Sequence, residues 1–183
     1  MILETDRLIL RHFTDDDAED VFKYARDPDV GPAAGWPPHK SVDESLDIIR
    51  NVLSYPETYA ICLKEDGKAI GVVDIRENAR TDLTDKDDEC ELGYWLGRPF
   101  WGRGIMPEAV REILKRAFTV LGMKKVWAGY YEGNEKSKRV QEKCGFKHKW
   151  MTIDVDVPQM KGKRTGHVNC ISREEWESSI KKK

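Results

Sequence analysis

The chain has 183 residues, of which 39% are hydrophobic and 35% are charged, and its formal net charge at pH 7 is -2. This length fits one domain over residues 1–183, with little room for a second. The near-neutral charge supplies no broad basic field for nucleic acid or an anionic membrane, and no apolar stretch approaches the roughly 20 residues of a membrane helix. Acidic residues stand near the N-terminus where a signal peptide has bases, so we expect a cytoplasmic protein.

Four cysteines, at positions 62, 90, 144 and 170, lie far apart in the chain. They form no CxxC pair and have no metal-ligand spacing with the four histidines. Each lies in or beside an apolar segment. We therefore expect buried free thiols and no metal site.

The first quarter of the chain predicts one strand and one helix. Leu8–Arg11 alternates in the manner of a strand. Thr14 is a candidate N-cap, because three aspartates follow it and residues 18–25 then repeat apolar side chains at helical spacing. The glycine- and proline-rich stretch Gly31–Pro38 is expected to be a loop, in which Trp36 is either packed or faces a substrate.

The next segments predict a helix, a hairpin and a loop. Ser41 and Glu44 have the spacing of a capping box at the start of a helix. Residues 59–63 and 69–75, joined through an Asp-Gly pair, predict a β-hairpin. Residues 76–88 are charged and almost free of apolar groups, so they predict a mobile, exposed loop.

The second half alternates strands and helices. The clearest helix has Pro107 in its first turn, a long apolar stripe and a stop at Gly122. The order of all elements is β, α, α, β-hairpin, β, α, β, α, β, β, which indicates an α/β domain of the mixed (α+β) kind. The remaining predicted elements are strands at 89–96, 125–131, 147–157 and 167–171, with 164–166 between the last two, and a short helix at 137–144.

A Gly-x-Gly turn precedes the longest predicted helix. Gly102 and Gly104 follow the strand 89–96 directly before Pro107. Glycines let the backbone approach a ligand closely, and the free N–H groups of a helix start favour an anion. The segment lacks the lysine of a P-loop and the third glycine of a dinucleotide fingerprint, so alone it fits either a tight turn or a diphosphate site.

A second segment makes the interpretation of the Gly-x-Gly turn more specific. About thirty residues further on comes Asn134-Glu135-Lys136-Ser137, followed by Glu142-Lys143-Cys144-Gly145-Phe146. Together with Leu3–Arg11, Glu91–Leu96 and Arg173–Trp176, these segments resemble the GNAT N-acetyltransferase superfamily, and within it the RimJ/RimL type of ribosomal-protein alanine N-acetyltransferases. The resemblance spans nearly the whole chain.

The resemblance implies one GNAT-type domain with a mixed, mostly antiparallel central sheet, splayed between the fourth and fifth strands and flanked by helices. It implies acetyl-CoA as cosubstrate and no metal. The backbone near Trp95, Leu96 and Gly97 would pair with the pantetheine arm, as a strand adds to a sheet edge. The implied pyrophosphate contacts are the amides of Gly102, Arg103, Gly104, Ile105 and Met106.

The same resemblance places Asn134 near the pantetheine arm and Ser137 beside the sulfur. Two positions depart from the superfamily's Arg/Gln-x-x-Gly-x-Gly/Ala pattern. Trp101 occupies its first position, as is familiar in this branch, and Met106 replaces the small residue at its last. Because backbone amides hold the diphosphate, we expect binding to survive the change at Met106.

Acetyl transfer to an amine needs a group that accepts the amine proton, because amines of pKa about 8 to 10.4 are mostly protonated at pH 7. Glu91 is our candidate base, since it lies on the strand that would border the thioester, and an exposed strand glutamate is the alternative. Glu89 is a weaker competitor. A backbone N–H on that strand would stabilise the oxyanion.

Ser137 is the candidate proton donor to the departing thiolate, and Tyr130 and Tyr131 are the alternative donors. Ser137 could instead be a polar residue at the start of a helix, with no role in the chemistry. The leading hypothesis is an N-acetyltransferase acting by direct attack on a primary amine, either a protein N-terminus or a small molecule. The alternative is a catalytically silent acyl-CoA-binding sensor or partner protein. We expect no nucleic-acid or membrane partner, and a monomer or homodimer.

Overall fold

The computed structural model describes residues 1–181, apart from the side chain of Ala79. Its internal contacts divide the chain into two compact units. One comprises Met1–Asp74 and Tyr94–Glu112, and the other comprises Ile75–Gly93 and the chain from Ile113 onward. Each unit is described by itself below. That residues 1–183 form one domain remains a prediction.

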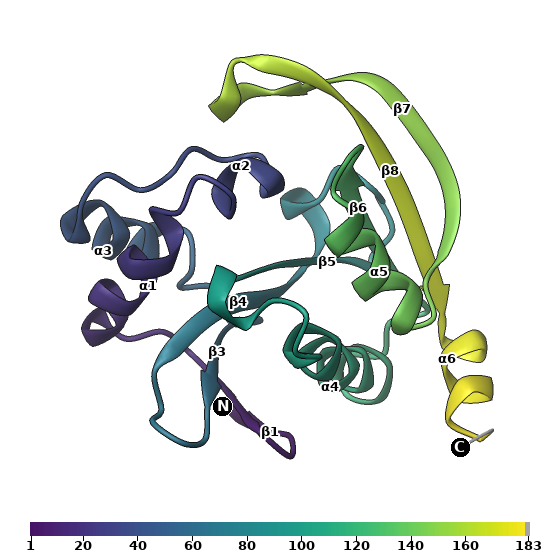
Figure 1. The fold of residues 1–183 in the computed structure, drawn as a ribbon. Coiled ribbons are helices and arrows are strands. Elements are labelled where there is room, and N and C mark those ends of the chain that lie inside the picture. Colours follow the sequence, from purple (N-terminus) through teal and green to yellow (C-terminus); the bar gives the residue numbers. More distant parts are fainter. Residues whose placement is uncertain (182–183) are drawn as a thin grey trace. The chain divides into compact units, whose positions relative to one another are not determined.

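The strands of the first unit form an antiparallel meander (Figure 1). Leu10 stands opposite Ile61, with both side chains fully buried, and in the predicted hairpin Tyr59 stands opposite Val73. The predicted strand at Leu8–Arg11 and the predicted hairpin are therefore confirmed, whereas the short first strand was not predicted. The strands are β1 (Ile2–Glu4), β2 (Leu8–Arg11), β3 (Thr58–Leu63) and β4 (Ala69–Arg76).

Helices of the first unit pack through one apolar cluster. Val21 and Ile49 form its buried centre, with Trp36 and Trp95 at its border. Thr14 caps the first turn as predicted, and Ser41 accepts a hydrogen bond from the Glu44 amide. The elements are η1 (Asp15–Asp17), α1 (Ala18–Ala25), α2 (Gly31–Ala34), α3 (Val42–Asn51) and η3 (Arg98–Phe100).

The expectation of an irregular loop over Gly31–Pro38 was wrong at its start, because Gly31–Ala34 forms the short helix α2. Proline is tolerated in a first helical turn, where its missing N–H is not needed, and two alanines follow it. Gly35, at φ 94°, ends the helix in the left-handed conformation. Trp36 is packed, with its ring centroid 5.7 Å from that of Trp95.

The second unit contains the parallel strand pair. The β5–β6 ladder joins only three residue pairs, from Glu89 opposite Lys125 to Glu91 opposite Trp127. The other pairs, β6–β8 and β7–β8, are antiparallel. A mixed, mostly antiparallel sheet, splayed between the fourth and fifth predicted strands, is thereby confirmed. The strands are β5 (Glu89–Leu96), β6 (Lys125–Tyr131), β7 (Lys147–Val157) and β8 (Gly162–Ser172).

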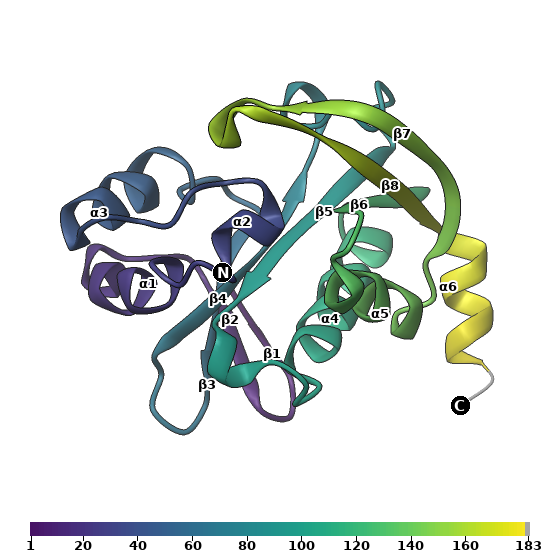
Figure 2. The ribbon, with the colours of Figure 1, turned by 45° about the horizontal axis from the view of Figure 1, so that its top comes forward.

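Helix α4 (Ile105–Thr119) runs from the first unit into the second, and its predicted stripe is buried from Val110 to Phe118. In both views α5 (Glu135–Lys143) lies against β6, and the long β7–β8 hairpin leads into α6 (Arg173–Ile180) (Figures 1 and 2). Short 3-10 turns complete the elements: η2 (Asn78–Arg80) and η4 (Pro158–Met160).

Two further expectations needed correction. Residues 164–166 belong to β8, which begins five residues earlier than the predicted strand. The segment 76–88 is not simply exposed, because the side chain of Thr81 is buried. The four cysteines are free and buried, as expected, and burial raises the pKa of Cys62 and Cys170 to about 11.

Candidate functional site

The turn between β5 and α4 has the backbone that its glycines predict. Gly102 and Gly104 have φ values of 73° and 75°, in the left-handed region that other residues rarely adopt. A Cβ at Gly102 would meet nothing within 4 Å, so the local surface is open there. The turn therefore exposes its backbone directly before the first turn of the helix.

No group within residues 1–181 accepts a hydrogen bond from the N–H groups of this turn, from Gly102 to Met106. The first helical bond runs from the Glu108 amide to the Gly104 carbonyl oxygen, at 3.2 Å. The Glu108 side chain does not turn back to cap the helix. It accepts from the Thr5 hydroxyl at 2.6 Å and from the Arg7 Nε at 2.7 Å. Unsatisfied N–H groups at the start of a helix are the groups that bind a phosphate.

The side chains around the turn leave this backbone accessible. Ile105 and Met106 are buried, so the unusual Met106 packs inward and contributes only its amide to the turn. The Arg103 guanidinium lies over the Phe100 ring, 5.7 Å from its centroid, and the Arg103 carbonyl accepts from Arg7 Nη1 at 3.1 Å. Arg7 is thus a second cation at the turn, which the sequence alone did not reveal, and these residues fit a diphosphate.

Two hydrogen bonds fix the backbone of residues 95–97, the segment predicted to pair with the pantetheine arm. The Gly97 amide donates to the Ile70 carbonyl of β4 at 2.8 Å, and the Trp101 indole N–H donates to the Leu96 carbonyl at 2.7 Å. Since successive peptide groups of a strand point to opposite edges, the Leu96 amide faces the edge away from β4. Of the predicted groups near Trp95, Leu96 and Gly97, this amide is the best placed to pair with an extended ligand.

Glu91 lies on β5 with a side chain that is 16% exposed. Its carboxylate accepts from the Thr81 hydroxyl at 2.8 Å and meets Arg76 Nη1 at 3.5 Å. Because Glu91 stands directly opposite Trp127 in the parallel ladder, the two side chains share one face of the sheet. The role of Thr81 as a direct partner of the candidate base could not be predicted from the loop's composition.

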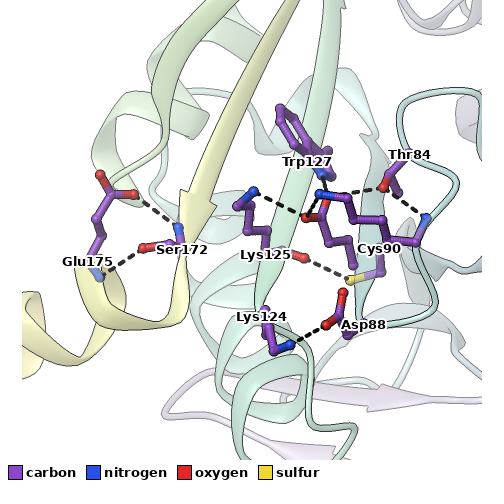
Figure 3. Close-up of polar contacts among 10 residues, drawn as sticks. Thr84, Asp88, Cys90, Lys124, Lys125, Trp127, Ser172 and Glu175 are labelled. Carbon is purple, nitrogen blue, oxygen red and sulfur yellow. Dashed lines mark hydrogen bonds and ion pairs between the residues drawn. The ribbon is translucent and has the colours of Figure 1, made fainter.

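Glu89 is held too firmly to act as the base; Figure 3 labels three of its hydrogen-bond partners, Thr84, Lys125 and Trp127. Its carboxylate is 4% exposed and accepts from Trp127 Nε1 at 2.6 Å, Thr84 Oγ1 at 3.0 Å, and the Lys125 and Lys86 ammonium groups at 3.2 and 3.3 Å. Burial would raise the pKa of Glu89, but these hydrogen bonds outweigh it and lower the pKa to about 2. A carboxylate this stable in its charged form is a poor proton acceptor at neutral pH.

Ser137 and Asn134 meet at the start of α5. Asn134, rather than Ser137, is the N-cap, because its Oδ1 accepts from the Ser137 amide at 3.1 Å. The Ser137 hydroxyl lies in the third position of the helix, where Oγ accepts from Gln141 Nε2 at 3.3 Å.

Tyr130 and Tyr131, the alternative acids, point to opposite faces of β6. Tyr130 stands opposite His167 of β8, and their rings stack with centroids 4.9 Å apart. Both line a pocket of about 310 Å³, to which α5 also contributes residues. Burial raises the pKa of Tyr130. The Arg164 guanidinium lies over the Tyr131 ring instead, 5.2 Å from its centroid. Tyr131 is on the same face of the sheet as Glu91 and Trp127. Only Tyr130 therefore shares a face with Ser137.

Residues 1–181 contain neither a metal-binding cluster nor a membrane-spanning helix. No cluster of three or more His, Cys, Asp or Glu side chains there could hold a metal ion. Among the same residues, no helix combines the length and the apolar character needed to cross a bilayer.

Comparison with known proteins places this geometry in context. The family model described as "Acetyltransferase (GNAT) domain" matches residues 7–147, which is most of the chain. The Bacillus subtilis protein named "Uncharacterized N-acetyltransferase YoaA" is 29% identical over 150 residues, covering 79% of this chain and 82% of the relative.

Two solved structures share the fold. An acetyltransferase of the GNAT family from Bacillus anthracis matches with a TM-score of 0.83 and 19% identity, covering 95% of this chain and 99% of the other. The ribosomal-protein-S5-alanine acetyltransferase from Vibrio fischeri matches with a TM-score of 0.70 and 19% identity, covering 96% and 98%. At these identities the likeness is one of fold.

Proposed function

Because the chain belongs to the GNAT acetyltransferase family and is an N-acetyltransferase, we propose that it transfers the acetyl group of acetyl-CoA directly to a primary amine. The acceptor is a protein N-terminus or a small-molecule amine. The resemblance to the RimJ/RimL type, and the named substrate of the Vibrio fischeri relative, favour the protein N-terminus. Cytoplasmic location and a monomeric or homodimeric state remain predictions.

The observation that carries the proposal is the open head of α4. The amides from Gly102 to Met106 have no acceptor among residues 1–181, two glycines hold them in a turn, and Arg7 and Arg103 flank it. This is the arrangement that receives the two phosphates of coenzyme A, because helix-start amides and cations both favour anionic oxygens. The thioester of acetyl-CoA supplies an activated acyl group.

The proposed chemistry divides between the two faces of the β6 strand. Glu91 would accept the ammonium proton of the acceptor, directly or through water, so that the neutral amine can attack. Ser137, on the α5 side, would donate a proton or a hydrogen bond to the departing sulfur.

A second candidate is a catalytically silent acyl-CoA-binding protein. The observation that favours it is the engagement of the Glu91 carboxylate by Thr81 and Arg76. These contacts hold the carboxylate in a fixed position, which is compatible with a base and equally with a purely structural residue. The two functions differ in turnover and not in cofactor binding.

The test combines acetyl-CoA titration with thiol release in the presence of an amine panel of peptides with free N-termini and small amines. We expect binding, turnover with at least one amine class, and loss of both in Gly104→Trp. Gly122→Trp is the matched control, because Gly122 has a nearly identical φ of 77° at the other end of α4. Equal binding by both variants would refute the diphosphate site, and binding without turnover across the panel would favour the silent protein.

A further inference from the structure

A buried polar side chain on α5 contacts the candidate acid. Gln141 is fully buried, and its Nε2 donates to the Gly129 carbonyl of β6 at 3.2 Å and to Ser137 Oγ at 3.3 Å. Burying an amide in a protein interior is costly unless it is hydrogen-bonded. An apolar side chain could fill the same space, so the specific partners of Gln141 call for an explanation.

Asn169 of β8 extends this contact into a chain. It is 3% exposed, and its Nδ2 donates to Gln141 Oε1 at 2.8 Å. Its Oδ1 lies 3.3 Å from Nδ1 of His148, an exposed residue of β7. Four side chains from three elements are thus joined in the order His148, Asn169, Gln141, Ser137.

The direction of every hydrogen bond in this chain follows from one backbone carbonyl. The Gly129 oxygen can only accept, so the Gln141 atom facing it must be Nε2. Gln141 then presents Oε1 to Asn169, which must donate through Nδ2 and present Oδ1 to His148. All donors therefore point toward Ser137, whose Oγ receives a hydrogen bond.

We propose that Gln141 and Asn169 are positioning residues, which orient the Ser137 hydroxyl for donation to the leaving sulfur. This inference rests on the proposed function, in which Ser137 is the acid. A hydroxyl oxygen that accepts from Gln141 directs its own proton elsewhere, so the chain fixes the rotamer of Ser137 and the side on which it donates. Neither positioning residue touches the reacting atoms.

A double-mutant cycle tests the proposal: wild type, Gln141→Met, Ser137→Ala and the double variant, with kcat and KM for acetyl-CoA measured for each. We expect Gln141→Met to lower kcat about tenfold, as for the loss of one oriented hydrogen bond, with KM within about twofold. In the Ser137→Ala background the same change should have no further effect. Glu142→Met, on the same helix at an exposed position, is the control and should leave kcat unchanged.

The outcomes separate the inference from the function on which it rests. An equal loss of kcat in both backgrounds would show a merely structural role and overturn the inference. Wild-type kcat in Ser137→Ala would also overturn it, while leaving acetyl transfer intact. Asn169→Asp, of nearly the same volume, removes the Nδ2 donor and serves as a second test should Gln141→Met not fold.

A measurement without turnover tests the same chain even in the absence of an active acceptor. We expect the side-chain amide signals of Gln141 in a 15N-labelled sample to shift in Ser137→Ala and to stay in place in Glu142→Met. Unchanged signals in Ser137→Ala would overturn the inference. A wild type that turns over no amine would instead refute the proposed function.

Discussion

Glu89→Gln removes the most strongly stabilised charge in the described part of the second unit. The wild-type carboxylate is 4% exposed and accepts hydrogen bonds from four side chains on β6 and on the loop 77–88. Glutamine keeps the shape but loses the charge that pairs with Lys86 and Lys125, and it replaces one accepting oxygen by an NH2 group. We therefore expect the folded state to lose stability while its fold is retained.

The magnitude follows from the pKa of Glu89, which falls from 4.5 to about 2 on folding. At about 1.36 kcal/mol per pKa unit, the charged form contributes about 3 kcal/mol to the free energy of unfolding at pH 7. Since the folded pKa lies below the unfolded one, this contribution is complete above pH 4.5 and disappears as the pH falls toward 2. About 2 kcal/mol of it should be gone by pH 3.

The assay is urea unfolding of wild type and Glu89→Gln between pH 7 and pH 3. We expect a stability difference of about 2 to 3 kcal/mol at pH 7 that shrinks to about 1 kcal/mol at pH 3. Asp88→Asn is the control, because Asp88 is the neighbouring carboxylate in a more exposed ion pair with Lys124 and should change little. A gap between wild type and Glu89→Gln that is the same at both pH values would refute the reasoning.

The other predictions concern the two halves of the candidate site. Glu91→Gln should remove the acid limb of the kcat/KM profile, and a profile that keeps this limb would exclude Glu91 as the base. Thr81→Val should lower kcat, because the Glu91 carboxylate loses the hydroxyl that orients it; an unchanged kcat would contradict this. Trp101→Phe should weaken acetyl-CoA binding about fivefold in a titration, by freeing the Leu96 carbonyl. Trp176→Phe, a change remote in sequence, should not; equal weakening would point to a general loss of stability.

Local sequence patterns were enough to predict most strands and helices. The stripe after Pro107, the hairpin around Gly67 and the cap at Thr14 each depend on neighbours a few residues away, and each is confirmed. The helix α2 was missed because glycine and proline, two helix-breaking residue types, lie at its ends. The start of β8 was missed because Arg164-Thr165-Gly166 resembles a turn. Pairing with β7 and β6 decides the latter, and pairing is not a local property.

The site was predictable only where backbone conformation carries it. Glycine at positions 102 and 104 predicts a turn with left-handed backbone conformations, which the structure has. The structure also shows that no group in residues 1–181 accepts a hydrogen bond from the amides of this turn. The side chains that set up the chemistry come from distant positions. Thr81 reaches Glu91, and Gln141 reaches Asn169, through folding contacts that no motif spacing records.

The most direct measurement of the central claim is amide NMR of the wild-type protein titrated with acetyl-CoA and with S-acetylpantetheine, which lacks the diphosphate. We predict that acetyl-CoA produces large shifts of the amide signals from Gly102 to Met106 and that S-acetylpantetheine leaves them nearly unchanged. Large shifts with both ligands, or acetyl-CoA binding that leaves these amides in place, would contradict it.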